Sequence, residues 1–205
     1  MEDSKTFIHS FCRIQNNEVV LNGESVFKVA EYLFGDFSKK AYQHFEINYP
    51  KFFKMDNLSK LAFLAAELLL KTENDTLVAN NTALVFANKS SSLDTDLKYQ
   101  ESISDKENYF PSPAVFVYTL PNICLGEISI RHQLKSENSF FIFADFNPSF
   151  MEKYANLLLE TKKANKVLCG WVEYYKEEYT AFLYLVTQKG DFMHNEHTLK
   201  KLYNN

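Results

Sequence analysis

Short apolar segments that alternate with helical patterns are the feature that most constrains the fold of this chain. Segment 82–87 (TALVFA) is almost wholly apolar, and segments 139–146, 166–174 and 180–186 are also rich in apolar and aromatic residues. Such runs are typical of strands that are buried on both faces, because helices cover the two sides of a parallel sheet. We therefore expect a layered α/β fold with a mostly parallel sheet.

The clearest helix precedes the first of these strands. Leu58, Leu61 and Leu64 recur at helical spacing, and either Asp56 or Asn57 can cap the helix at its amino end. The apolar face is wide and rich in alanine. This pattern indicates a helix that packs closely against a sheet.

The second half of the chain carries one more strong helix signal and two polar stretches. Asn147 is suited to cap a helix over 150–163, and Pro148 is suited to its first position. Segment 88–108 is polar and rich in serine, which predicts a long exposed loop with at most one helical turn. The polar tail over 191–205 predicts a frayed end or a short helix.

The composition excludes several classes of protein. The 205 residues hold 22 Lys and Arg against 26 Asp and Glu, a formal charge of −4, so no nucleic-acid partner is expected. Apolar residues make up 46% of the chain, enough for the core of a single domain over 1–205. No apolar window reaches the ~18 residues of a membrane span, so no membrane partner is expected.

The chain has only five glycines, about a third of the usual ~7%. A glycine-rich phosphate loop is therefore not expected, and neither is a cofactor. Few positions are expected to adopt a positive φ.

Three widely spaced cysteines, Cys12, Cys124 and Cys169, indicate free thiols in a reducing cytoplasm rather than a disulfide framework. Cys12 and Cys169 fall on expected strands and are interpreted as buried small apolar residues. Cys124 lies near a helix start, where a reactive thiol is the alternative interpretation.

Three segments follow one another in the order and spacing of a known family. Segment 54–67 (KMDNLSKLAFLAAE) is similar to R-M-D-x-x-x-x-L-A-x-x-A-A, 112–122 (SPAVFVYTLPN) to S-P-x-x-F-x-x-x-x-P-N, and 126–135 (GEISIRHQLK) to G-x-I-A-I-x-x-G-L-x-G. Together they resemble the amino-terminal half of β-ketoacyl synthases, the condensing enzymes of the thiolase-like fold, over roughly 51–186. The resemblance implies a half-thiolase unit with a five-stranded, mixed, mostly parallel sheet and helices on both faces.

The resemblance also implies where catalysis would take place. In the family, a strand delivers a cysteine to the start of a helix, where the thiol pKa falls and the thiolate accepts an acyl group. The residue at that position here is Asp145, whose carboxylate cannot form the family's thioester. Ser136 and Pro148 stand where the neighbouring loops of the family have glycine. Asp145 is alternatively only a carboxylate that stabilises a helix start.

Length is a further departure, because an active synthase is about twice as long and its two catalytic histidines come from its second half. The resemblance therefore implies a chain without catalytic residues. We expect a non-catalytic ketosynthase-like protein, similar to the chain-length-factor partners, in fatty-acid, polyketide or polyene-pigment biosynthesis. A degenerate paralogue without such a role is a plainer alternative.

The resemblance implies partners as well. Family members dimerise edge to edge through the strand that here contains Phe143, and a half-unit should leave apolar surface exposed. We expect a homodimer, or a heterodimer with a full-length ketosynthase, with acyl carrier protein as a further candidate. Such carriers are acidic and this chain has a formal charge of −4, which disfavours direct docking.

Other groupings of residues offer alternatives. Asp145 with His132 or His194 would suit an acyl-thioester hydrolase or decarboxylase. His194, Glu196 and His197 lie within one helical turn, as metal ligands do. A polar, frayed tail favours a structural role for them, so no metal site is expected.

Aromatic and basic residues near the end of the chain carry weaker signals. Trp171, Tyr174 and Tyr175 could line an acyl pocket, although aromatic strand residues usually form core. The basic pairs Lys162-Lys163 and Lys200-Lys201 suit helix ends and are too sparse for a phosphate track.

Overall fold

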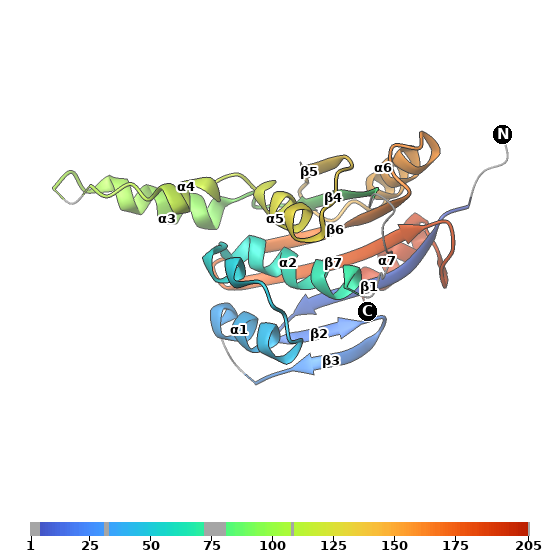
Figure 1. Cartoon of the computed structure of the whole chain (residues 1–205), viewed down its shortest axis with the longest axis horizontal. Helices are drawn as coiled ribbons and strands as arrows, with labels where there is room; N and C mark the ends of the chain where they lie inside the picture. Colours follow the sequence, from blue (N-terminus) through green and yellow to red (C-terminus); the bar gives the residue numbers. More distant parts are fainter. Residues whose placement is uncertain (1–4, 31–32, 72–80, 108, 205) are drawn as a thin grey trace.

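The computed structural model describes residues 5–30, 33–71, 81–107 and 109–204. Its strands and helices alternate along the chain and form one sheet with helices on both faces (Figure 1). The strands are β1 (Phe7–Gln15), β2 (Glu18–Leu21), β3 (Glu24–Lys28), β4 (Thr82–Asn88), β5 (Asn138–Ile142), β6 (Lys166–Tyr175), β7 (Glu178–Thr187) and β8 (Phe192–Met193). The helices are α1 (Phe34–His44), the 3-10 helix η1 (Pro50–Lys54), α2 (Asn57–Leu70), α3 (Leu93–Ser104), α4 (Pro113–Val117), α5 (Ile123–His132), α6 (Pro148–Glu160) and α7 (Glu196–Asn204).

The sheet is mixed, as expected, but larger than expected. Its strand order is β3-β2-β1-β7-β6-β4-β5, and β8 pairs with β1. Strands β4, β5 and β6 are mutually parallel, and β7 is antiparallel to both β6 and β1. Among β1, β4, β5, β6 and β7, every strand except β7 therefore runs in one direction. This agrees with the expected mostly parallel sheet. The sheet has eight strands rather than five because tight turns at 16–17 and 22–23 add the antiparallel strands β2 and β3, and the short strand β8 pairs with β1.

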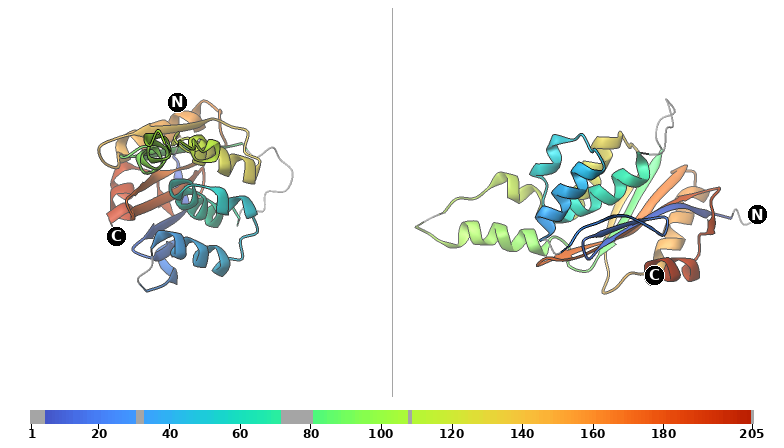
Figure 2. Two further views of the ribbon diagram at one scale, coloured as in Figure 1. Left: turned by 90° about the vertical axis from the view of Figure 1, so that its left-hand side faces the viewer. Right: turned by 90° about the horizontal axis from the view of Figure 1, so that it is seen from below.

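Helices cover both faces of the sheet and bury two apolar layers (Figure 2). On one face, α1, α2 and α5 pack over residues such as Leu84, Leu168 and Leu183. On the other face, α6 and α7 cover Val85, Trp171 and neighbouring residues. The period-two alternation of the strands sends successive side chains to opposite faces, so one sheet supports both layers.

The expectation of a loop over 88–108 is wrong, because α3 (Leu93–Ser104) lies within it. Acidic side chains suit its first turn, and Lys98 Nζ lies 2.6 Å from Asp94 Oδ2, one turn away. Helices α3 and α4 together project beyond the end of the sheet (Figures 1 and 2). We call residues 93–107 and 109–120 the arm.

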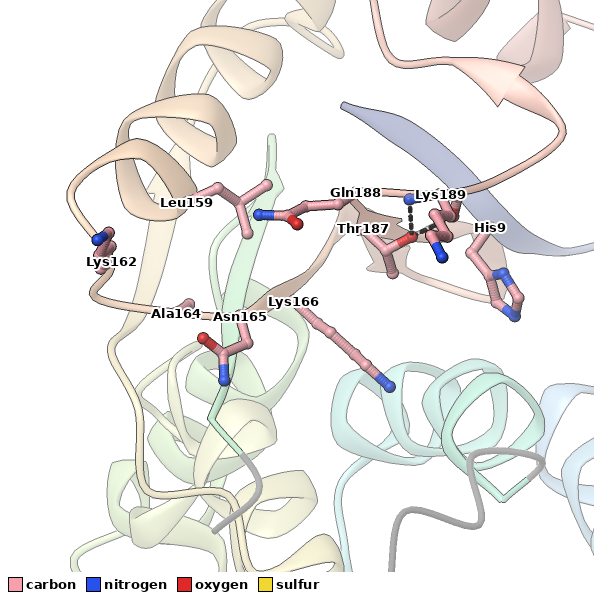
Figure 3. A pocket seen from close by; sticks show the side chains of 9 residues that line it. All are labelled: His9, Leu159, Lys162, Ala164, Asn165, Lys166, Thr187, Gln188 and Lys189. Atoms are coloured by element: carbon pink, nitrogen blue, oxygen red, sulfur yellow. Dashed lines mark hydrogen bonds between the residues drawn. The ribbon is translucent and has the colours of Figure 1, made fainter. Parts of the chain in front are cut away.

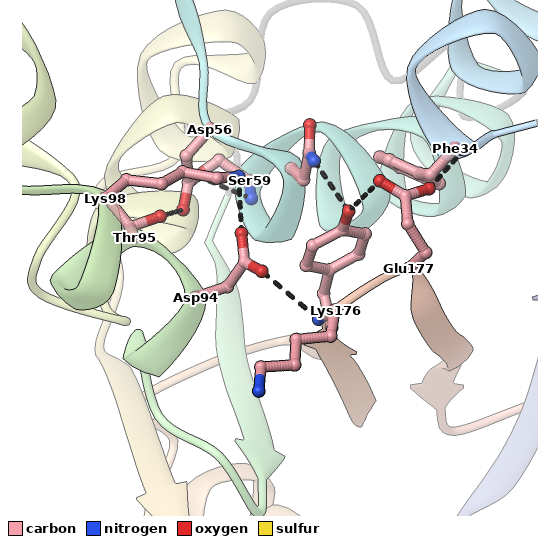
Figure 4. Close-up of polar contacts among 10 residues, drawn as sticks. Phe34, Asp56, Ser59, Asp94, Thr95, Lys98, Lys176 and Glu177 are labelled. Carbon is pink, nitrogen blue, oxygen red and sulfur yellow. Dashed lines mark hydrogen bonds and ion pairs between the residues drawn. The ribbon is translucent and has the colours of Figure 1, made fainter. Parts of the chain in front are cut away.

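Polar contacts fix the base of the arm to the body (Figure 4). The Asp56 carboxylate accepts a hydrogen bond from the Ser59 amide at 2.9 Å, which confirms Asp56 as the cap of α2, and another from Thr95 Oγ1 of α3 at 2.8 Å. Asp94 accepts a hydrogen bond from the Lys176 amide at 3.1 Å, in the turn between β6 and β7. The arm therefore has a defined orientation relative to the sheet.

Two other sequence expectations are corrected. The strand expected over 139–146 is only the five residues of β5, and its side chains are half-buried or exposed because β5 is an edge strand that pairs with β4 alone among the described strands. The short helix offered for the tail is confirmed as α7, and fraying is wrong, because Leu199 and Leu202 are buried against α6 and the sheet.

Positive φ angles are more frequent than the glycine count predicts. Nine described residues other than glycine adopt them, most of them in tight turns and at helix ends. One is Gln133, with φ 55°, which ends α5 at the position where the resembling motif has glycine. The left-handed conformation explains why the motif has glycine at this position, because glycine adopts it without strain. This chain keeps the same conformation with Gln133 in place of glycine.

Gln133→Gly is expected to raise the free energy of unfolding by about 1 kcal/mol, because the left-handed conformation costs a side-chain-bearing residue about that much. Gln133 is exposed, so little packing is lost. Urea unfolding monitored by circular dichroism measures the change. An unchanged or lower midpoint would show that Gln133 is not strained.

Candidate functional site

Asp145 is exposed and lines a cavity of about 320 Å³ at the carboxyl ends of β4, β5 and β6. Parallel strands bring their carboxyl ends to one edge of a sheet, and α/β proteins usually bind ligands there. Asn147, two residues further on, accepts a hydrogen bond from the Phe150 amide at 3.0 Å and caps α6 as expected. The helix start is therefore capped by Asn147 rather than by Asp145.

The walls of this cavity combine aromatic and charged side chains. Phe146 packs against Tyr203 of α7, with ring centroids 4.7 Å apart, and against Trp171 at 6.3 Å. Burial raises the pKa of Tyr203, and the carboxylates of Asp145 and Glu173 raise it further. The remaining lining residues are Lys89, Ala144, Pro148, Lys200 and Asn204.

A second cavity, of about 430 Å³, adjoins the first and shares Lys89 and Glu173 with it. The Glu173 carboxylate accepts hydrogen bonds from the amides of Lys89, at 2.7 Å, and Ser90, at 3.1 Å. Glu173 therefore holds the backbone that separates the two cavities, and it acts as a structural acceptor rather than a free base.

Neither of the two histidines proposed as partners of Asp145 lines its cavity. His132 ends α5 on the opposite face of the sheet, where its Nε2 lies 2.9 Å from Glu67 Oε2. Arg131 Nη2 lies 2.7 Å from the other oxygen of the same carboxylate. Burial alone would raise the pKa of Glu67, but hydrogen bonds from His132 and Arg131 outweigh burial and lower the pKa to about 2.

His194 is buried at the other end of α7 from the Asp145 cavity. Its Nδ1 lies 3.3 Å from both Thr6 Oγ1 and Asn156 Oδ1, and its amide donates to the Thr6 carbonyl at 2.9 Å. Its ring packs against Tyr184, with centroids 5.7 Å apart. No group of three metal-ligating side chains occurs among the described residues. His194 therefore joins the tail to the first strand and does not form a dyad with Asp145.

Burial lowers the pKa of His194 to about 4 from 6.5. The unfolded chain therefore binds a proton near pH 6.5 that the folded chain binds only near pH 4, so stability is full above pH 6.5 and falls on acidification. We expect the free energy of unfolding to drop by about 2 kcal/mol between pH 6.5 and pH 5. Urea titrations at the two pH values measure this drop. In His194→Gln the drop should shrink by that amount, and an equal drop in both proteins would contradict the assignment.

All three cysteines are buried and free, which confirms the interpretation of Cys12 and Cys169 and removes the alternative for Cys124. Burial raises the pKa of the Cys12 thiol to about 12, and it also raises the pKa of Cys124 and Cys169. Thiols of this kind do not ionise near neutral pH, so they are poor nucleophiles.

The three aromatic residues of β6 do not share one pocket. Trp171 lines the Asp145 cavity, Tyr175 lines the adjoining one, and Tyr174 lies in the core layer under α1 and α2. The Tyr174 hydroxyl donates to Glu177 at 2.9 Å and accepts from Asn57 at 2.7 Å. The alternative of a common acyl pocket is therefore wrong, because alternate strand residues point to opposite faces. The preferred interpretation as core is confirmed for Trp171 and Tyr174, which are buried.

Two apolar surfaces remain exposed on the described part of the chain. The outer edge of β5 carries no charged residue and no proline in its sequence NSFFI, and Ile142 is 49% exposed there. The arm exposes most of its apolar side chains, of which Phe110 is 73% exposed; the others are Leu93, Leu97, Tyr109, Phe116, Val117 and Leu120. Patches of this kind mark contact surfaces.

No helix in the described residues has the length and hydropathy needed to cross a membrane. This finding concerns only residues 5–30, 33–71, 81–107 and 109–204.

No protein-family model and no curated protein matches the sequence. Solved structures match by fold. The ishigamide ketosynthase/chain length factor gives a TM-score of 0.68 at 16% identity, over 89% of this chain and 62% of that one. The complex of the ketosynthase ApeO with its chain length factor ApeC, from Xenorhabdus doucetiae, gives 0.59 at 13% identity, over 91% of this chain and 80% of that one. A β-ketoacyl synthase from Burkholderia phymatum gives 0.58 at 11% identity, over 97% and 61%.

These matches show that the chain has the thiolase-like fold of ketosynthases, as the three sequence motifs indicated. The chain spans about three fifths of the first structure's matched chain. This chain covers 80% of the matched chain in the ApeO–ApeC complex, so the two chains are similar in length.

Proposed function

We propose that the chain is a non-catalytic, ketosynthase-like subunit of chain-length-factor type. It would pair with a full-length ketosynthase that assembles a fatty-acid, polyketide or polyene chain. The observation that carries this proposal is the identity of the residue between β5 and α6. The family that the three motifs resemble has its nucleophilic cysteine at that position, and here it is Asp145.

The surroundings of Asp145 support the absence of condensation chemistry. An ordinary carboxylate does not form the acyl thioester that condensation requires. No histidine lines its cavity among the described residues, so neither His132 nor His194 is placed to act with it as a general base or acid. The three thiols are buried and their pKa values are raised, so none of them replaces the missing nucleophile.

Pairing with a ketosynthase is supported by the exposed surfaces and by the relatives. A sheet edge without charge or proline invites another strand, and β5 has such an edge. The arm adds exposed apolar side chains at the end of the sheet. Two of the similar structures combine a ketosynthase with a chain length factor, and one matched chain is of comparable length.

An acyl carrier protein is a further candidate partner, because one similar structure is a ketosynthase complex with an acyl-carrier protein. The formal charge of −4 on this chain disfavours a direct contact with an acidic carrier. In our proposal the ketosynthase subunit makes that contact, and this chain shapes the space that receives the acyl chain.

The proposal is tested by incubating the pure protein with malonyl and acyl thioesters and following thiol release. We expect thiol release with the parent protein to be no faster than thiol release without protein. Asp145→Ala should give that same rate. Asp191→Ala, which changes another exposed aspartate, serves as the control variant. Turnover that is lost in Asp145→Ala but kept in Asp191→Ala would overturn the non-catalytic proposal and favour a hydrolase or decarboxylase.

A further inference from the structure

A cavity of about 550 Å³ lies at the end of the sheet opposite to Asp145 (Figure 3). It opens where β6 begins at Lys166, where β7 ends at Thr187, and beyond the end of α6. In Figure 3, Lys162 and Asn165 lie on one side of it, Lys189 and His9 lie on the other, and Lys166 extends between them. A volume of this size fits a small organic ligand rather than a single ion.

The charged residues described in the lining of this cavity are all basic. Lys162 and Lys189 contribute ammonium groups from opposite walls, and Lys166 and His9 also line it. No aspartate or glutamate lines it among the described residues. Asn165 and Gln188 add carboxamides, which can donate to an anion without adding charge. We call this cavity the basic pocket.

The local backbone holds the segment that carries Lys162 in place. Lys162 adopts φ 58° directly after α6, and its amide donates to the Leu159 carbonyl at 3.1 Å. The amides of Lys163 and Ala164 donate to the Leu158 carbonyl at 3.0 and 3.2 Å. The chain itself thus satisfies carbonyls at the carboxyl end of α6. The partial negative charge of this helix end, which would otherwise attract the lysine side chains, is therefore weaker.

The opposite wall is also fixed. The Lys189 amide donates to Thr187 Oγ1 at 3.2 Å. Gly190 follows, and a Cβ there would lie 2.5 Å from the Ile8 carbonyl oxygen of β1. This close approach holds the turn that carries Lys189 against the sheet. The two walls therefore present their lysines on a rigid frame rather than on loose loops.

We propose that the basic pocket binds a small organic phosphate that carries at least two negative charges. Lysine ammonium groups suit the several oxygens of a phosphate, because they donate in three directions without a fixed plane. The Leu159 and Ala164 side chains give the pocket an apolar wall for the organic part of the ligand. This site is separate from the Asp145 cavity and does not depend on the function proposed above.

Isothermal titration with inorganic pyrophosphate and with adenosine diphosphate, at constant ionic strength, tests the proposal. We expect at least one of these probes to bind one to one with a Kd below about 1 mM. The key variant is Lys162→Asn, which removes one charge and suits the left-handed conformation, so the fold should be retained. It should weaken binding about tenfold, as the loss of one charge-assisted contact implies. Lys189→Gln should do the same.

Lys39→Gln is the matched control, because Lys39 is an exposed lysine of α1 that does not line the pocket. It should change the Kd less than twofold. Failure of both probes to bind at about 10 mM would overturn the proposal. It would also be overturned by an unchanged Kd in Lys162→Asn, or by an equal weakening in Lys39→Gln, which would indicate attraction to the whole protein rather than to this pocket.

Discussion

Gly170→Ala is expected to lower the free energy of unfolding by at least about 4 kcal/mol, because an added Cβ meets closer atoms at Gly170 than at any of the other four glycines. Gly170 lies in β6, opposite Leu183 of β7, with φ 156°. An added Cβ would lie 2.0 Å from the Phe182 carbonyl oxygen and 2.9 Å from Leu183 Cα. These are backbone atoms of the paired strand, so relief requires separation of two central strands.

Gly126→Ala is the matched control for this prediction. Gly126 lies in α5, and no atom lies within 4 Å of a Cβ built there. Alanine should therefore leave stability unchanged or raise it by about 1 kcal/mol, because it favours helix over glycine. Urea unfolding of both variants measures the contrast. If Gly170→Ala unfolds at the midpoint of the parent protein, the packing of β6 against β7 described here is wrong.

Ile142→Lys is expected to weaken the complex with a ketosynthase about a hundredfold. Ile142 is the last residue of β5 and is 49% exposed on the edge strand. Edge-to-edge pairing would bury it, and a lysine there brings an ammonium group that must lose its water without a partner. Loss of the apolar contact and burial of an unpaired charge would each weaken the affinity about tenfold, and together they account for about a hundredfold. The affinity is measured by titrating the synthase against labelled protein.

Met193→Lys controls for a general effect of the same substitution. Met193 is 48% exposed in β8, which pairs with β1, and three strands separate β1 from β5. Met193→Lys should leave the affinity for the synthase within twofold of the affinity of the parent protein. Equal weakening by both substitutions would show that β5 is not the contact edge.

Local signals in the sequence were sufficient for most of the sheet and for two helices. The apolar run TALVFA became β4, which is buried throughout. Asp56 and Asn147 cap the helices that their positions predicted. These features depend on residues that are close together in the chain, where the physical cause is visible in the sequence.

Other features depend on tertiary contacts and escaped prediction. Helix α3 has few buried residues, so its apolar pattern is weak, and it is tied to the body by contacts of Thr95 and Asp94 with distant segments. The tail appeared polar, yet Leu199 and Leu202 suffice to fix α7. Two apolar residues in a short segment do not distinguish a packed helix from a frayed one.

The candidate sites also separate into features that nearby residues determine, which the sequence predicted, and features that distant segments determine, which it did not. The sequence placed Asp145 between a strand and a helix, but its alternative partners, His132 and His194, lie elsewhere because each packs into its own buried cluster. The basic pocket was not foreseen, because Lys162, Lys189 and His9 come from separate segments that only the sheet brings together. The pair Lys162-Lys163 alone looked too sparse to bind phosphate.

In our proposal, this chain associates with a full-length ketosynthase and has no condensing activity of its own. The most direct test is to co-express it with the ketosynthases of its source organism and determine the mass of the purified species by light scattering. We predict a complex with the mass of one chain of each protein, and no such complex with Ile142→Lys. A synthase that elutes as its own dimer while this chain elutes alone would contradict the claim.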